Sequence, residues 1–98
     1  MKMQTTLDIA ADHPAFLGHF PAFPVLPGAS LLDEMLHAIA QARGIEPGHW
    51  RLSSAKFLDA VRPRDSLVLE HDCASAGLIH FTIHAGGRKV ASGTLHEP

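Results

Sequence analysis

The chain has 98 residues, 46% of them hydrophobic and 18% charged, and a formal net charge of −2. A chain of this length has room for one modest core, so we expect residues 1–98 to form a single domain whose leftover apolar surface favours oligomers. The slightly acidic charge excludes the electrostatic signature of a nucleic-acid-binding protein, and no run approaches the roughly 20 apolar residues that span a bilayer.

The N-terminal segment has no apolar run of the kind that marks a secretory signal. The one cysteine, Cys73, excludes an internal disulfide framework and is typical of a reducing compartment. We therefore expect a soluble, cytoplasmic protein. The first predicted element is a short edge strand over residues 3–9.

Residues 13–28 predict a loop, because their four prolines and two glycines break both helices and central strands. This loop is unusually apolar, which favours a buried segment or the lining of a pocket. Its large apolar side chains are Phe16, Leu17, Phe20, Phe23, Val25 and Leu26.

A helix is predicted from Pro27 or Gly28 to Arg43, with proline at the start and Gly44 just past the end. Apolar residues cover most of its circumference, so we expect other structure to wrap around it. The remaining polar strip consists of residues one turn apart: Asp33, His37 and Gln41.

The rest of the chain alternates as strands do. We predict strands over Trp50–Ala60, Ser66–Ala74, Leu78–Ala85 and Arg88–Leu95, with a two-residue hairpin turn at Gly86-Gly87. One long helix followed by an antiparallel meander indicates an α+β fold in which the sheet folds around the helix.

Eight histidines invite a metal interpretation, and His80 and His84 are the closest pair by spacing. On a strand, however, two side chains four positions apart lie about 13 Å from each other. They cannot share an ion, so we expect no metal site.

The chemistry of the loop and helix favours proton transfer next to a carbonyl. His19 can accept a proton near neutral pH among apolar neighbours. The helix start at Gly28 offers free N–H groups and a positive dipole end to an oxyanion. Asp33, expected to be partly buried with a raised pKa, would donate a proton. A base, an oxyanion site and an acid suit the β-elimination of water from an acyl thioester.

The sequence at 18–28, Gly-His-Phe-Pro-Ala-Phe-Pro-Val-Leu-Pro-Gly, is similar to the histidine signature of bacterial 3-hydroxyacyl-acyl-carrier-protein dehydratases. In that family an acidic residue follows the histidine by fourteen positions, as Asp33 follows His19. Residues 56–67 resemble the family's Lys-Phe…Pro-Gly-Asp strand and turn. Sequence motifs carry the resemblance over about residues 13–67, and the order of the predicted strands carries it over the rest of the chain.

The resemblance implies a hotdog fold, an antiparallel sheet wrapped around one central helix, in a dimer or a trimer of dimers. It implies that His19 and Asp33 of different protomers dehydrate a (3R)-hydroxyacyl group on acyl carrier protein, without cofactor or metal, in fatty-acid or polyene-type biosynthesis. The short chain resembles compact members associated with aryl-polyene-type pathways. Further site residues are expected to bind the oxyanion and the acyl chain: Gly28, Phe20, Phe23 and Pro27.

Three basic residues, Lys56, Arg62 and Arg64, form either a solvated rim or a contact for the acidic surface or 4′-phosphopantetheine phosphate of the carrier protein. Arg64 also departs from the family, because glycine usually occupies that turn. His37 replaces a glutamine, and when protonated it would weaken Asp33 as an acid. Ala22 replaces a glycine.

Two alternatives remain open. A hotdog thioesterase would use a carboxylate to activate water, although the histidine fourteen positions before the acid argues against it. A non-catalytic acyl-binding subunit would explain the departures from the family pattern, although the retention of both His19 and Asp33 argues against it.

Overall fold

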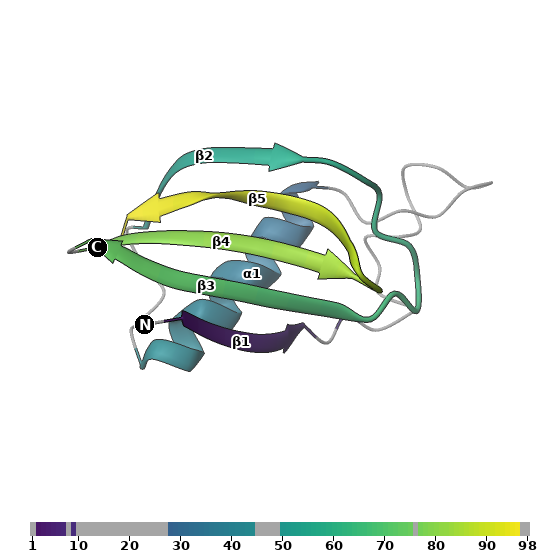
Figure 1. The fold of residues 1–98 in the computed structure, drawn as a ribbon, viewed down its shortest axis with the longest axis horizontal. Coiled ribbons are helices and arrows are strands. Elements are labelled where there is room, and N and C mark those ends of the chain that lie inside the picture. Colours follow the sequence, from purple (N-terminus) through teal and green to yellow (C-terminus); the bar gives the residue numbers. More distant parts are fainter. Residues whose placement is uncertain (1, 8, 10–27, 45–49, 76, 97–98) are drawn as a thin grey trace.

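The computed structural model describes residues 2–7, 9, 28–44, 50–75 and 77–96. Within them one helix lies across one face of an antiparallel sheet, so the predicted α+β layout is confirmed (Figure 1). The elements, in chain order, are β1 (Lys2–Leu7), α1 (Gly28–Arg43), β2 (Arg51–Phe57), β3 (Leu67–Ser75), β4 (Leu78–Ala85) and β5 (Arg88–His96).

The five strands follow the order β1-β3-β4-β5-β2, and all neighbours are antiparallel. β1 and β2 therefore form the two edges, as predicted for the N-terminal strand. The β4–β5 hairpin turns at Gly86 and Gly87, whose φ angles of 55° and 87° only glycine adopts without strain. The predicted bounds of β4 are confirmed at both ends.

The second predicted strand was too long, since β2 ends at Phe57 rather than Ala60. The reason is local hydrogen bonding. The backbone N–H groups of Leu58 and Asp59 both donate to the Val90 carbonyl oxygen of β5, at 2.8 and 3.4 Å, so the regular one-to-one pairing ends after Phe57. The next N–H, of Ala60, donates to the Asp59 side chain at 2.8 Å instead of to β5.

The core lies between α1 and the sheet. Alternate residues of β3 and β4 face the helix and are buried, among them Leu67, Leu69, Ile79 and Ile83. His71 is also buried in this layer and is the one buried polar residue among those described. Burial and the nearby Arg43 guanidinium hold the pKa of His71 below its usual value.

α1 crosses the sheet diagonally, from the β2 edge at its start to the β1 side at its end (Figure 1). It ends at Arg43, and Gly44 follows with a φ of 66°, as expected of a helix C-terminal glycine. Of the helices that the structure describes, none has both the length and the apolarity needed to cross a membrane.

Close contact between β5 and β2 depends on Gly93. A Cβ atom at this position would overlap the carbonyl oxygen of Ser54 and lie 2.7 Å from the ring of Phe81. The missing side chain therefore lets the edge strand approach and lets the Phe81 ring fill the space.

Candidate active site

Asp33 and His37 lie one turn apart on the exposed side of α1. The His37 Nδ1 and Asp33 Oδ2 atoms are 3.8 Å apart, and the side chains are 62% and 70% exposed. The predicted polar strip is therefore confirmed, and it extends to Ala29 and Gln41, which are also exposed. The complete wrapping of the helix that its apolar circumference predicted does not occur within one chain.

The predicted partial burial of Asp33 is wrong for the single chain. Its apolar neighbours Leu31 and Met35 turn toward the sheet, whereas Asp33 points along the opposite strip. An apolar sequence neighbourhood does not bury a helical side chain, because successive residues point about 100° apart around the axis. Any dry environment for this carboxyl must come from outside the described residues of one chain.

The other predicted catalytic residue, His19, lies outside the described residues. The same is true of three residues predicted to line the acyl site: Phe20, Phe23 and Pro27.

Gly28 is the first residue of α1, as predicted. The ring of Phe57, at the end of β2, lies against it so closely that a Cβ on Gly28 would be 2.7 Å from the ring. Phe57 is itself 50% exposed. The helix start thus lies beside an exposed aromatic ring and next to the loop that follows β2.

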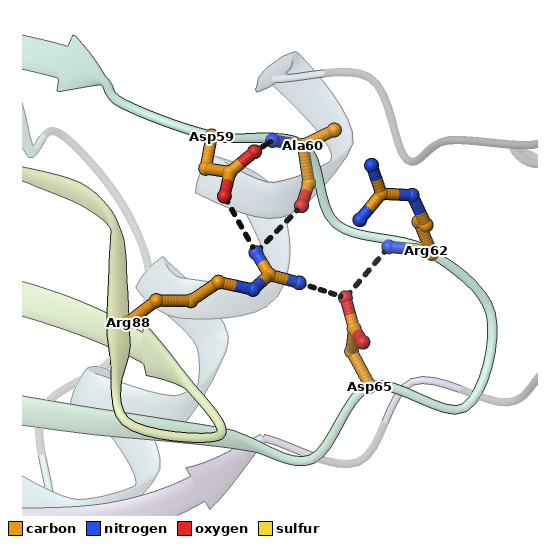
Figure 2. Close-up of polar contacts among 5 residues, drawn as sticks. All are labelled: Asp59, Ala60, Arg62, Asp65 and Arg88. Atoms are coloured by element: carbon orange, nitrogen blue, oxygen red, sulfur yellow. Dashed lines mark hydrogen bonds and ion pairs between the residues drawn. The ribbon is translucent and has the colours of Figure 1, made fainter.

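Arg88, from the start of β5, clamps both ends of that loop (Figure 2). Its Nη1 atom donates to Asp59 Oδ2 at 3.0 Å and to the carbonyl oxygen of Ala60 at 3.2 Å. Its Nη2 atom donates to Asp65 Oδ2 at 2.9 Å. The hydrogen bond from Ala60 N–H, followed by the charges of Arg88 and Arg62, lowers the pKa of Asp59.

The role of Arg88 was not predicted from the sequence. No local signal marks it, because its partners lie 23 to 29 positions earlier in the chain. Only the pairing of β5 beside β2 brings them together.

The three basic residues predicted as a carrier-protein contact, Lys56, Arg62 and Arg64, lie in two separate places. Arg62 and Arg64 share one exposed turn between β2 and β3. Lys56 instead lies on the outer face of the sheet, where it lines a shallow hollow of about 400 Å³ with His80, Ser92 and Thr94.

The histidines of the outer face have polar partners. His84 Nε2 lies 3.1 Å from Glu70 Oε1, and His80 Nδ1 lies 3.3 Å from the Thr94 hydroxyl. A hydrogen bond from Lys2 and the nearby His84 lower the pKa of Glu70. Within the described ranges, no group of three or more histidine, cysteine or acidic side chains is arranged to hold a metal ion.

The family model ApeI-like, described as ApeI dehydratase, matches residues 1–94. The chain belongs to this dehydratase family. It is therefore an enzyme of the hydro-lyase class, as predicted. A curated relative, the 3-hydroxyacyl-[acyl-carrier-protein] dehydratase FabZ of Enterococcus faecalis, is 33% identical over 99 residues, covering 90% of this chain and 70% of the relative.

Solved structures confirm the fold of this dehydratase as a hotdog. The Dehydratase Heterocomplex ApeI:P from Xenorhabdus doucetiae matches with a TM-score of 0.73 and 24% identity, over 97% of this chain and 85% of that chain. The fluoroacetyl-CoA thioesterase FlK matches with a TM-score of 0.69 and 15% identity, over 97% of this chain and 83% of that chain. The fold alone thus does not separate dehydratases from thioesterases.

Proposed function

We propose that this dehydratase removes water from (3R)-hydroxyacyl groups carried on acyl carrier protein and releases trans-2-enoyl products in fatty-acid or polyene-type biosynthesis. The family match over residues 1–94 carries the proposal. It is supported by Asp33, which stands fourteen positions after His19 and lies on an open strip of α1. Residues 1–98 would form one domain and act in the cytoplasm.

In the proposed mechanism, His19 removes a proton from the carbon next to the thioester carbonyl. The electron pair moves toward the carbonyl, whose oxygen the N–H groups at Gly28 stabilise. The bond from C3 to its hydroxyl oxygen then breaks, and a proton from Asp33 lets that oxygen leave as water. Phe20, Phe23 and Pro27 would line the path of the acyl chain, and no step needs a cofactor.

A dimer would complete this site. The exposure of Asp33 in one chain supports this, because a proton donor in a dry site needs a cover. The edge strand β2 offers the joining surface: all its residues are exposed, including Leu52, and exposed Leu58 follows it. An open edge with apolar side chains favours pairing with another strand. A trimer of such dimers is the next possible assembly.

The carrier protein would approach the basic residues Lys56, Arg62 and Arg64. Arg62 and Arg64 belong to the loop that begins beside the helix start, where Phe57 lies on Gly28. A positive surface there would attract the acidic carrier and bring its thioester to the helix start.

The test is turnover of a panel of 3-hydroxyacyl carrier proteins by wild type, His19→Ala and Asp33→Asn. We expect kcat to fall by about 10²-fold or more in each variant. Glu34→Gln and His96→Ala are matched controls that change a carboxyl or an imidazole elsewhere and should retain activity. Hydrolysis of the thioester by wild type would replace this proposal with a thioesterase, and acyl binding without turnover would replace it with a binding subunit.

A further inference from the structure

Arg64 has a backbone conformation that side-chain-bearing residues rarely adopt. Its φ is +72°, the one positive value among the non-glycine residues that the structure describes. The Asp65 N–H donates to the Arg62 carbonyl oxygen at 3.2 Å, which closes a four-residue turn with Pro63 second and Arg64 third. Glycine is favoured at the third position of such a turn, so arginine there lowers stability.

The clamp by Arg88 keeps this turn in place. Asp59 precedes the turn and Asp65 ends it, and both carboxylates bind the same guanidinium (Figure 2). Asp65 Oδ2 also accepts a hydrogen bond of 2.9 Å from the backbone N–H of Arg62. Because Arg88 belongs to β5, the turn is attached to the sheet, which can hold a strained residue.

The clamp also sets the charge of the loop. Arg88 forms ion pairs with the carboxylates of Asp59 and Asp65, so Arg62 and Arg64 are the exposed charged side chains of the loop that lie outside these ion pairs. The Arg62 guanidinium points away from Asp65 (Figure 2). Among the described residues, no hydrogen bond or ion pair is found for the Arg64 side chain. The chain as a whole carries −2, so this turn is a local positive surface on an acidic protein.

We propose that the clamped turn at Arg62–Asp65 is a docking contact for carboxylates on the surface of the acyl carrier protein, with Arg64 as the contact and Arg88 as its positioning residue. The proposal rests on the proposed function, which names this partner. A guanidinium displayed on an exposed turn suits a broad acidic surface, since arginine binds carboxylates in a fixed geometry. Substitution of glycine for Arg64 would remove the backbone strain. We therefore expect selection to keep a strained arginine here only if its charge has a function, such as docking.

The experiment compares one 3-hydroxybutyryl group on three carriers: a bacterial acyl carrier protein, 4′-phosphopantetheine and pantetheine. Arg64→Gly removes charge and strain together, whereas Arg64→Lys keeps the charge. We expect Arg64→Gly to raise Tm by about 2–5 °C. It should also raise KM for the carrier protein by about 3- to 10-fold, so that the ratio of kcat/KM for carrier protein to that for pantetheine falls. Arg64→Lys should restore most of this ratio.

Lys89→Gln is the matched control, because Lys89 is an exposed cation next to Arg88 and outside the clamp. It should leave the ratio unchanged. Arg88→Gln should lower the ratio of kcat/KM for carrier protein to that for pantetheine when Arg64 is present. It should not lower this ratio in the Arg64→Gly background, because Arg88 acts only by positioning Arg64. High salt should reduce the carrier preference of wild type more than that of Arg64→Gly.

An unchanged ratio in Arg64→Gly would overturn the proposal, as would an equal loss with all three substrates. An equal loss with carrier protein and phosphopantetheine would assign Arg64 to the phosphate and overturn the carboxylate contact. If wild type dehydrates none of the thioesters, the proposed function fails by itself. Binding of the unloaded carrier protein, followed by fluorescence anisotropy in wild type and Arg64→Gly, then still tests the docking contact.

Discussion

Arg43 donates a hydrogen bond of 3.1 Å from its Nε atom to Nδ1 of His71, which joins the end of α1 to the middle of β3. Because Nδ1 accepts, the neutral imidazole carries its proton on Nε2. That Nε2 atom and Nη2 of Arg43 are buried without a hydrogen-bond partner among the residues described. A second positive charge on His71 would therefore face a guanidinium in the interior.

The His71–Arg43 pair predicts a loss of stability in mild acid. The folded protein holds the pKa of His71 below the value of about 6.5 that it has when unfolded. The unfolded chain therefore binds the proton first, and stability falls as the pH drops from about 6.5 toward the lowered pKa. Urea unfolding at a series of pH values measures this loss.

In His71→Gln this part of the pH dependence should disappear, and in Arg43→Gln it should shrink. His80→Gln, which removes an exposed histidine, serves as the control. If wild type and His71→Gln lose stability in parallel below about pH 6.5, then His71 is not the group responsible.

Gly93→Ala should strongly destabilise the fold. The new methyl group would overlap the backbone oxygen of Ser54, and backbone cannot rotate away as a side chain can. We expect a loss of about 3 kcal/mol, equivalent to a fall in Tm of about 12 °C or more. Thermal unfolding followed by circular dichroism measures it, with Ser92→Ala on the same strand as the control; an equal effect of both changes would contradict the close approach.

The β2 edge predicts an assembly that charge can break. Leu52 and Leu58 are 42% and 49% exposed in the single chain. Leu52→Asp combined with Leu58→Asp should give monomers. Burying these like charges in the interface would cost more free energy than pairing of the two β2 edges releases. Light scattering after size-exclusion chromatography measures the mass. Activity should fall with the dimer, and active monomers would contradict a site completed by a second copy.

Local chemistry made most of the fold predictable. Gly86-Gly87 specified the hairpin, and alternation specified the bounds of β4. The helix from Gly28 to Arg43 followed from its terminal proline and glycine. The end of β2 was not predictable, because the sequence continues to alternate while the N–H groups of Leu58 and Asp59 converge on one carbonyl oxygen of β5.

The site was less predictable than the fold. The sequence placed Asp33 and His37 on one strip correctly, since i and i+4 neighbours follow from helix geometry. It could not give the exposure of Asp33, which depends on what covers the helix. It also could not give the Arg88 clamp or the packing of Phe57 on Gly28, because both arise from contacts between segments far apart in the chain.

The sheet order has a kinetic consequence. β3, β4 and β5 follow one another through short turns, whereas β1 and β2 pair with strands far along the chain. Local hairpins form before distant segments close, so the three central strands should fold first and the edges last. Slow-exchanging amides would then concentrate in β4. The apolar edge strand β2 would therefore form only after the core of the same chain has folded. This order limits the time in which an exposed β2 could pair with unfolded copies of the chain.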